Sequence, residues 1–374
     1  MIVVNVLILL IILVFFGIQC FSLISIIQHQ SSPIKKQTDW PKVTLLLAAR
    51  NEEQLIIRSL TSITNLDYSK GKLEVLIGND ASTDNTQQLV SEFISDKPNY
   101  RLININKTVG KGRGKANVLG QLAHHANGEI YLITDVDVKL PKNWVKALVQ
   151  EFTKEVGIVS GTTKCERGNL FANLQAMDWL HFMGYIKAFA NYGVGCTSVG
   201  NNMAVKAKAY WQTGGYENID FSITEDYKLF KEVTCRGWKW KTLMGKDSLG
   251  LAWYIPQFSE MLHQRKRWLI GARDLPLNWK FMIVLYGLFV PAVFLIMMQD
   301  LELGLTIWTT KFLMQSVFIF FLCQKAERRS FSLSQMLAYE VYVVSNTLAT
   351  AIFYFLPIKS VWKGREYNQA YVKD

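Results

Sequence analysis

The chain has 374 residues, a formal net charge of +11 and a hydrophobic content of 50%. This length accommodates one large domain together with membrane segments, and the apolar residues are clustered as such segments require. Because the positive charge is spread along a chain with apolar segments, a basic surface against anionic lipid explains it better than nucleic-acid binding. The five cysteines show neither paired nor metal-ligand spacing, which is typical of a reduced cytosolic domain.

Residues 1–28 are expected to form an N-terminal transmembrane helix. Residues 1–27 contain no charged side chain, and the stretch is about long enough to cross a bilayer. A cleaved signal peptide would need a basic start and a shorter apolar core followed by small residues, and these features are missing. An uncleaved anchor is therefore predicted.

From residue 43 onward, short apolar segments alternate with amphipathic ones. Strand-helix alternation with short connections predicts an α/β fold, with a mostly parallel central sheet covered by helices on both faces. In such sheets, ligands bind at the carboxyl ends of the strands. The strands are expected at residues 43–49, 73–78, 101–105 and 130–134, and the helices at 53–64, 86–94, 115–125 and 144–152.

Polar residues follow three of these strands. The first strand ends in ARNEE (49–53), the second in NDASTD (79–84) and the fourth in DVD (135–137). Two carboxylates as close as Asp135 and Asp137 repel each other unless a cation or donors compensate, so a divalent metal that holds a diphosphate is the simplest explanation. Helix caps and turns use the same residue types, and Asp84 is equally well explained as a cap. Three such ends at one edge of the sheet favour a binding site.

A glycine-rich loop at residues 109–115, VGKGRGK, precedes the helix expected at 115–125. Glycines let the backbone approach a ligand, and Lys115 at a helix start can meet a phosphate or a base. The Walker pattern is not matched, because Ala116 stands where that pattern has a hydroxyl residue. Taken alone, the loop is better explained as a flexible surface turn.

Three further apolar segments follow, at residues 281–298, 303–323 and 333–357. Lys311 interrupts the second and Glu340 the third, so each is either a spanning helix with a packed polar residue or a segment in the membrane interface. Four spans in total are expected, with three spans plus one interfacial helix as the alternative.

The distribution of basic residues predicts the orientation. Lys35 and Lys36 follow the first apolar segment, whereas Asp300 and Glu302 lie between the first two C-terminal ones. The positive-inside rule therefore places the central region in the cytoplasm, at the plasma (inner) membrane. The tail at 359–374 is also basic, which conflicts with a fourth full crossing, and the sequence leaves that conflict open.

Together the motifs resemble those of family 2 glycosyltransferases, whose nucleotide-sugar domain has the fold called GT-A. The resemblance covers roughly residues 43–268, and the motifs occur in the order of that family. They are ARNE (49–52), NDASTD (79–84), GK (114–115), DVD (135–137), GNNMA (200–204), GGY (214–216), TED (224–226) and QRKRW (264–268).

This resemblance implies an inverting transferase that uses a UDP-sugar donor together with Mg²⁺ or Mn²⁺. Asp137 would ligate the metal, and Asp226, with Glu225 beside it, would be the general base. Family members often continue the Gly-Lys turn with Ala-Leu-Asn, whereas Gly120 follows Leu119 here, so Lys111 remains an alternative to Lys115. The implied donor-binding residues are Ala49, Arg50, Glu52, Asp80, Lys115, Asp135 and Asn202.

Gln264, Arg267 and Trp268 match the Q-x-x-R-W motif of cellulose, hyaluronan and chitin oligosaccharide synthases, and ceramide glucosyltransferases carry a similar one. By this resemblance, Arg267 would pair with the diphosphate and Trp268 would stack on an acceptor sugar. An interfacial helix with basic and aromatic anchors is an alternative that is compatible with this role. For the nearby tryptophans, a core or membrane-interface role ranks ahead of an acceptor platform; they are Trp238, Trp240 and Trp253.

The expected protein is thus a membrane-bound glycosyltransferase acting on a glycan or lipid-linked acceptor. Its rivals are an inactive membrane scaffold with a transferase-like domain and a membrane-anchored oxidoreductase, the latter lacking G-x-G-x-x-G after the first strand. The expected domains are an N-terminal transmembrane helix (1–28), a linker (29–41), a cytoplasmic GT-A domain (42–252), an interfacial segment (253–279), C-terminal transmembrane helices (280–358) and a tail (359–374).

Overall fold

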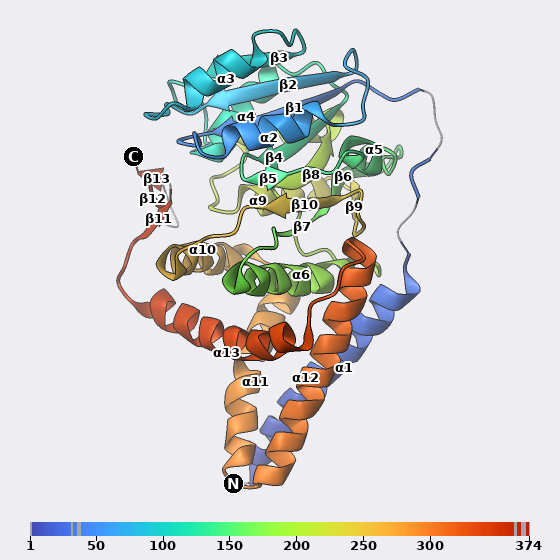
Figure 1. Cartoon of the computed structure of the whole chain (residues 1–374), viewed down its shortest axis with the longest axis vertical. Helices are drawn as coiled ribbons and strands as arrows, with labels where there is room; N and C mark the ends of the chain where they lie inside the picture. Colours follow the sequence, from blue (N-terminus) through green and yellow to red (C-terminus); the bar gives the residue numbers. More distant parts are fainter. Residues whose placement is uncertain (1, 31–32, 36–38, 363–364, 368–371, 374) are drawn as a thin grey trace. The chain divides into compact units, whose positions relative to one another are not determined.

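The computed structural model describes residues 2–30, 33–35, 39–362, 365–367 and 372–373 (Figure 1). The predicted linker at 29–41 and the tail at 359–374 therefore lie partly outside the described residues. The chain divides into two compact units. We call them the sheet unit, formed by Ser31–Glu166, Thr197–Ile255 and Lys359–Asp374, and the helical unit, formed by Met1–Gln30, Arg167–Cys196 and Pro256–Ile358.

The larger sheet of the sheet unit is built from β1 Val43–Ala49, β2 Leu73–Asn79, β3 Tyr100–Asn104, β4 Ile130–Asp135, β6 Val156–Ser160, β8 Asn202–Lys206 and β9 Lys239–Thr242. Among the described residues its seven strands follow the order β3-β2-β1-β4-β8-β6-β9. The first four are mutually parallel, whereas β8 is antiparallel to both β4 and β6. The predicted mostly parallel α/β sheet is confirmed.

Two smaller sheets belong to the same unit. One has the order β5-β10-β7, with β5 Val138–Lys139, β10 Leu249–Ala252 and β7 Thr162–Cys165. The other has the order β11-β12-β13, with β11 Ser360–Trp362, β12 Arg365–Tyr367 and β13 Val372–Lys373. The helices of the unit are α2 Ile56–Thr64, α3 Thr86–Ile94, α4 Lys115–His124, α5 Trp144–Val149, α7 Ala207–Gln212, α8 Gly215–Asn218 and α9 Glu225–Cys235.

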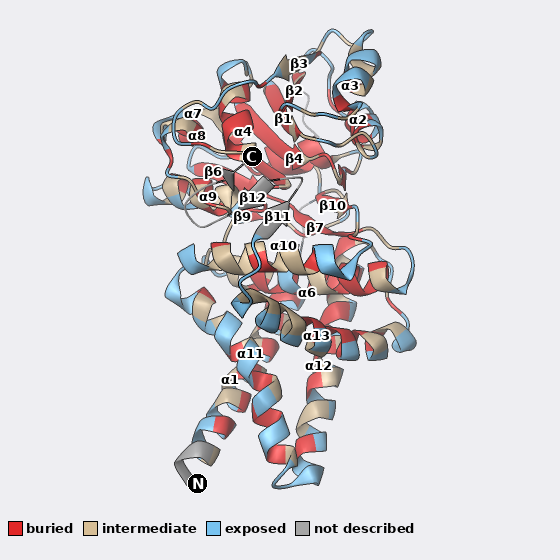
Figure 2. Cartoon of the chain, turned by 90° about the vertical axis from the view of Figure 1, so that its left-hand side faces the viewer, coloured by how far each residue is buried: buried red, intermediate tan, exposed pale blue. Residues whose placement is uncertain are grey.

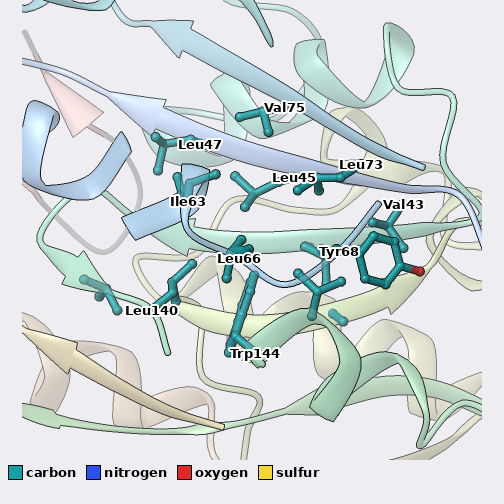
Figure 3. Close-up of a cluster of buried hydrophobic side chains, with 14 of the residues drawn as sticks. Val43, Leu45, Leu47, Ile63, Leu66, Tyr68, Leu73, Val75, Leu140 and Trp144 are labelled. Carbon is teal, nitrogen blue, oxygen red and sulfur yellow. The ribbon is translucent and has the colours of Figure 1, made fainter. Parts of the chain in front are cut away.

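Alternate residues of β1 enter two different hydrophobic clusters, as the two-residue period of a strand requires. Leu45 and Leu47 pack in a cluster with residues of α2 and α5, among them Trp144 (Figure 3). Leu46 packs in the cluster on the other face, together with Val118 of α4. Because both faces are covered, the strand needs an almost continuous apolar sequence, which is why its position could be predicted closely.

The predicted elements of this unit are confirmed, with differences at their ends. The helix expected at 53–64 begins only at Ile56. Glu53, placed inside that predicted helix, instead accepts hydrogen bonds through Oε2 from the backbone nitrogen (3.1 Å) and Nδ2 (2.9 Å) of Asn85. A tertiary contact of this kind leaves no signal in local sequence periodicity.

The helical unit comprises α1 Ile2–Gln28, α6 Leu170–Ala190, α10 Phe258–Gly271, a 3₁₀ turn at Ala272–Asp274, α11 Leu277–Met297, α12 Leu301–Ala326 and α13 Leu333–Phe355. Among the described residues, four of these helices are long and apolar enough to cross a membrane: α1 (over Asn5–Gln28), α11, α12 and α13. Figures 1 and 2 show α1, α11 and α12 running side by side, whereas α13 runs across them, as do α6 and α10.

The structure divides the region predicted as one catalytic domain, 42–252, differently: Arg167–Cys196, which includes α6, belongs to the helical unit. The hydroxyl of Ser25 on α1 donates to the backbone oxygen of Ala188 on α6 over 2.8 Å. Gly184 lets α12 approach α6, because a Cβ at this position would lie 2.5 Å from Leu322 Cδ1. The sequence could not assign this insertion, since an apolar helix suits the interior of either unit.

The two polar residues that interrupt the C-terminal apolar segments pair with each other. Lys311 Nζ on α12 lies 2.5 Å from Glu340 Oε1 on α13, and Gln315 Nε2 donates to Glu340 Oε2 over 3.0 Å. The side chains of Lys311 and Glu340 are 4% and 10% exposed. Pairing compensates for part of the cost of burying both charges, and it attaches the crosswise helix α13 to α12.

We expect Lys311→Met to destabilise the helical unit by about 3–5 kcal/mol, because it leaves the Glu340 carboxylate buried without its cation. Thermal unfolding in detergent micelles, followed by circular dichroism, measures the effect. The double variant Lys311→Met/Glu340→Leu removes both charges and should recover most of the lost stability. A double variant as unstable as the single one would show that the ion pair itself, rather than the uncompensated charge, dominates.

Candidate functional site

The carboxyl ends of β2, β1 and β4 lie next to each other at one edge of the larger sheet. Ala49 pairs with Asn79 of β2, and Ala48 pairs with Asp135 of β4. The polar segments that follow these strands therefore leave the sheet side by side, which confirms the predicted convergence of the three strand ends. The rest of the site is built on this edge.

Hydrogen bonds connect the segments after β1 and β2. Arg50 Nη1 donates to the backbone oxygen of Asp80 over 2.8 Å, and the backbone nitrogen of Glu52 donates to Thr86 Oγ1 over 2.7 Å. Asn51 and Ala81 adopt positive φ angles of 52° and 48°. Residues other than glycine rarely adopt this conformation, and such strain is often found where a backbone is shaped for binding.

Ala49 and Asp80 are tightly enclosed members of this edge. Ala49 is 1% exposed, its side chain belongs to the core, and its carbonyl accepts a hydrogen bond from the backbone nitrogen of Asp80 over 2.9 Å. It therefore shapes the edge without offering a side chain to a ligand. Asp80 is 8% exposed.

Asp84 had two interpretations, a helix cap or part of the binding site, and its hydrogen bonds show a structural role. Its Oδ1 accepts from the backbone nitrogen of Thr86 over 3.0 Å, at the start of α3. Its Oδ2 accepts from the backbone nitrogen of Glu53 over 3.1 Å. The N-cap of α3 is Asn85, so Asp84 is not the cap itself; from the position before it, Asp84 joins the first residue of α3 to the segment after β1.

Lys115 lies among carboxylates contributed by distant parts of the chain. Its Nζ is 2.5 Å from Asp135 Oδ1 and 3.2 Å from Glu225 Oε1, and it donates to the backbone oxygen of Gly200 over 3.1 Å. Burial alone would lower the pKa of Lys115, but the nearby carboxylates outweigh it and raise that pKa, so the ammonium group stays charged. Lys111 instead pairs with the exposed Asp220 over 2.7 Å, so Lys115 is the lysine at the site.

Asp226, in the first turn of α9, is held by two backbone nitrogens. Gly200 N donates to Oδ2 over 2.8 Å, and Tyr227 N donates to Oδ1 over 2.7 Å. A Cβ at position 200 would lie 2.8 Å from the Cβ of Asp226, so only glycine permits this approach. The carboxylate is therefore fixed in orientation by the loop before β8.

Burial and the adjacent charge of Glu225 raise the pKa of Asp226 to about 6, although Lys115 and the two backbone hydrogen bonds act in the opposite direction. A carboxylate with this pKa is deprotonated at neutral pH, yet it is a much better proton acceptor than an ordinary aspartate. These are the properties that a general base needs. Glu225 raises the pKa of this carboxylate electrostatically, and it shares Lys115 with Asp135.

Asp137 lies between β4 and the two-residue strand β5. Its backbone oxygen accepts from Arg58 Nη1 over 3.0 Å and from Trp253 N over 2.8 Å. Among the described residues, no group of three or more His, Cys, Asp or Glu side chains could hold a metal ion. The role of Asp137 as a metal ligand therefore stays a prediction, in which a bound diphosphate and water would supply the remaining oxygen ligands.

The structure corrects the prediction that Asn202 contacts the donor. It is 0% exposed, and Trp144 Nε1 donates to its Oδ1 over 2.7 Å. Its Nδ2 donates to the backbone oxygens of Thr162 and Ser248, over 2.8 and 3.0 Å. All of its amide groups are used to join parts of the sheet unit, so it stabilises the fold and is not placed to contact a donor sugar.

Gln264, Arg267 and Trp268 lie on α10 of the helical unit, where their spacing places them on one face of the helix. The intervening residues anchor the helix. Arg265 forms an ion pair with Asp178 on α6, and Lys266 Nζ donates to two backbone oxygens at the end of α13, those of Phe353 (3.1 Å) and Leu356 (2.7 Å).

Trp268 is packed from two sides in this unit. The Arg265 guanidinium lies 4.5 Å from the centre of its ring, and Trp179 of α6 contacts it edge-on at 5.2 Å between ring centres. Sequence reasoning missed Asp178 and Trp179. Their signal was an acidic residue next to a tryptophan in a mostly apolar helix, and it was missed because the insertion that carries this helix was not recognised.

A family model described as glycosyl transferase family 21 matches residues 6–371. The chain belongs to glycosyl transferase family 21. The family number, 21, differs from that of the family 2 resemblance. The expected class is confirmed: a glycosyltransferase with a GT-A-like fold and with apolar helices that suit membrane anchoring.

Among curated relatives, this family 21 chain is 30% identical over 198 residues to the probable glycosyltransferase YdaM of Bacillus subtilis, covering 50% of this chain and 46% of the relative. It is 24% identical over 295 residues to the beta-monoglucosyldiacylglycerol synthase of Synechocystis sp., covering 73% and 59%. It is 24% identical over 241 residues to the poly-beta-1,6-N-acetyl-D-glucosamine synthase of Staphylococcus aureus, covering 63% and 56%. The chain thus spans about half of the length of the curated relatives that it matches.

A solved structure of mannosyltransferase PcManGT from Pyrobaculum calidifontis, in complex with GDP-Man and Mn²⁺, matches 94% of this chain and 98% of its own with a TM-score of 0.56. At 19% sequence identity this likeness shows the fold alone.

The pH dependence of transfer should report the tuning of Asp226. We expect kcat/KM to fall as the pH drops through about 6, because protonated Asp226 cannot accept a proton. Glu225→Gln removes a charge that raises the pKa of Asp226. In this variant the acidic limb, the decrease of kcat/KM on the acidic side, should therefore move to lower pH. The matched control is Asp220→Asn, which removes an exposed carboxylate outside this cluster and should not move the limb. An acidic limb unchanged by Glu225→Gln would contradict the assignment.

Proposed function

We propose that this chain is a metal-dependent, inverting glycosyltransferase of the cytoplasmic membrane face, which transfers a sugar from a UDP-sugar to a glycan or lipid-linked acceptor. The observation that carries the proposal is the cluster formed by Lys115, Asp135, Glu225 and Asp226. It combines a fixed cation with a carboxylate base at the strand ends where an α/β sheet binds its ligands.

Asp226 would accept the proton of the acceptor hydroxyl as the acceptor oxygen attacks the anomeric carbon. The new glycosidic bond forms while the bond from that carbon to the diphosphate breaks, so the nucleoside diphosphate leaves with the bonding electrons. Arg50 and Asp80 would contact the nucleoside, Asp135 the ribose or donor sugar, and Lys115 the diphosphate region. Asp137 would hold Mg²⁺ or Mn²⁺, which neutralises charge on the departing diphosphate when it is bound.

In the helical unit, the face shared by Gln264, Arg267 and Trp268 would contribute to recognition of phosphate and of the acceptor, as the family resemblance implies. Arg267 offers a planar cation suited to phosphate, and the Trp268 ring is already oriented by Arg265 and Trp179. A side chain held in place loses less entropy on binding than a mobile one does.

Two acceptor classes fit this proposal, and relatives of the chain are named after products of both, a polysaccharide and a glycolipid. Membranes containing the chain, incubated with a panel of radiolabelled UDP-sugars and then separated into lipid and polymer fractions, would identify both donor and acceptor. Label in neither fraction for any donor, with metal present, would favour an inactive scaffold.

Binding experiments should distinguish the proposed base, Asp226, from the proposed metal ligand, Asp137. Asp226→Asn should lower the transfer rate by about 10²–10⁴-fold and leave UDP affinity nearly unchanged, because the base acts on the acceptor. Asp137→Ala should weaken UDP binding in the presence of Mn²⁺. Transfer by purified chain and calorimetric UDP titration measure the two effects, with Asp220→Asn as the control. Transfer by Asp226→Asn near the unmodified rate would rule out the base assignment.

The membrane topology that we propose has three spans, α1, α11 and α12, with α13 in the membrane interface. This was the alternative to four spans, and three observations support it. Helix α13 runs across the other three helices (Figure 2). One side of it is apolar and exposed, as at Leu337 (53%), Val341 (72%) and Leu348 (61%). The basic segment that follows it, Lys359–Asp374, groups with the sheet unit.

Cysteine labelling with a membrane-impermeant maleimide tests this topology, with the exposed Cys235 of the sheet unit as an internal reporter. We expect Cys235 and Lys359→Cys to react in inverted vesicles, and Glu302→Cys to react in intact cells. In a chain that also carries Cys235→Ser, Val341→Cys should react in neither preparation, because its side chain faces the acyl chains. If Lys359→Cys reacted from the same side as Glu302→Cys, α13 would cross the membrane and the chain would have four spans.

A further inference from the structure

Arg58 on α2 links four parts of the sheet unit. Its Nη1 donates to the backbone oxygen of Asp137 over 3.0 Å. Its Nη2 lies 2.6 Å from Glu166 Oε2, just after β7, and 3.4 Å from the backbone oxygen of Leu251 on β10. The guanidinium also lies 5.3 Å from the centre of the Trp253 ring. One side chain thus connects a helix of the larger sheet to the smaller sheet β5-β10-β7.

These contacts converge on the segment that carries Asp137. The backbone nitrogen of Trp253 donates to the same Asp137 oxygen that Arg58 contacts, over 2.8 Å. One residue earlier on the same strand end, the backbone oxygen of Ala252 accepts a hydrogen bond from the backbone nitrogen of Glu166 over 2.7 Å. Arg58 and Trp253 therefore both contact the Asp137 carbonyl oxygen, and Glu166 pairs with Arg58 beside them.

The Asp137 segment has little other regular structure to hold it. The strand that follows it, β5, has two residues, and it pairs with β10 only through Lys139 with Leu251 and Val138 with Ala252. A guanidinium suits the task of holding such a segment, because its planar fork offers several donors in a fixed geometry and stays charged. The Arg58 side chain is 21% exposed, so its contacts are partly shielded from water.

We propose that Arg58 is a positioning residue, which sets the affinity for a metal-bound nucleoside diphosphate by fixing the backbone that carries Asp137. The inference rests on the proposed function, in which Asp137 anchors the cation. A ligand carboxylate must be held within a fraction of an ångström for a metal to bind well, and the groups that orient it commonly change affinity by about 10–100-fold. Arg58 acts on the main chain of the ligand residue rather than on its side chain.

This role differs in a measurable way from that of an ordinary structural ion pair. Loss of a structural pair would lower stability and would weaken UDP binding to a similar extent with and without metal. Loss of a positioning contact should weaken only the part of the affinity that Mn²⁺ adds. The ratio of the UDP dissociation constants in EDTA and in Mn²⁺ isolates that part.

The experiment is calorimetric titration of the purified full chain with UDP, in Mn²⁺ and in EDTA. Arg58→Met keeps the length of the side chain and removes its donors. We expect it to reduce the Mn²⁺-dependent gain by about 10-fold or more, with UDP affinity in EDTA within about twofold of that of the unmodified chain. Arg58→Lys keeps the charge but not the fork, so it should restore only part of the gain. Glu166→Gln weakens the ion pair that orients Arg58 and should reduce the gain less than Arg58→Met does.

The matched control is Arg236→Met. Arg236 also pairs with a glutamate, Glu232, over 2.7 Å, and also donates to a backbone oxygen, that of Gln212 over 3.0 Å, but it is outside the set of contacts around Asp137. Its loss should leave the Mn²⁺-dependent gain unchanged. Hydrogen exchange adds a readout that needs no nucleotide: the amide of Trp253 should exchange faster in Arg58→Met than in Arg236→Met.

Two outcomes would overturn the inference, and they are distinguishable. If Arg58→Met kept the full Mn²⁺-dependent gain, or lost affinity equally in EDTA, Arg58 would be only a structural residue, and the proposed function would stand. If the unmodified chain showed no Mn²⁺-dependent gain with UDP or with GDP, the proposed function would fail and this inference with it.

Discussion

The arrangement of the site depends on one lysine that is placed among acids. Asp135, Glu225 and Asp226 come from the end of β4 and the start of α9, and they would repel one another without a compensating cation. Lys115 supplies that charge from the start of α4, and it also contacts the backbone of Gly200. Gly200 in turn holds Asp226. Removing the lysine would therefore disturb the charge balance and the position of the Asp226 carboxylate together.

Antiparallel insertion of β8 makes this convergence possible. Asn202 pairs with Thr134 near the end of β4, so the residues just before β8 lie beside the residues just after β4. Asn202 then uses its whole amide group to hold the neighbouring strands and Trp144. A buried amide with all its hydrogen bonds made fixes the backbone around it, which explains how the adjacent Gly200 can be placed accurately. One short segment thus contains both Asn202, which stabilises the fold, and Gly200, which holds a residue of the site.

In the helical unit, residues of one short motif attach helices to one another. Of the residues in QRKRW, Arg265 and Lys266 attach α10 to α6 and to the end of α13. Trp268 packs against Arg265 and against Trp179 of α6, so it also contributes to this attachment. Lys311 and Glu340 attach α13 to α12 in the same unit, through a buried ion pair in which each charge compensates the other.

The sequence alone determined the α/β fold, most element positions and the order of the motifs. Strands buried on both faces need long apolar segments, and parallel strands bring their carboxyl ends to one edge, so Asp80, Asp135 and Asp137 could be assigned to that edge from local patterns. The sequence also located the apolar helices, because a bilayer requires a minimum apolar length.

Only the tertiary structure decided which polar residues gather at the strand ends and which make all their hydrogen bonds within the fold. It separated Lys115 from Lys111, assigned Asn202 to the core, attached α6 to the helical unit and turned α13 across its neighbours. Each of these outcomes depends on contacts between residues far apart in the chain. A hydrogen bond such as that from Arg58 to Asp137 spans 79 residues, and local periodicity carries no information about a partner at that distance.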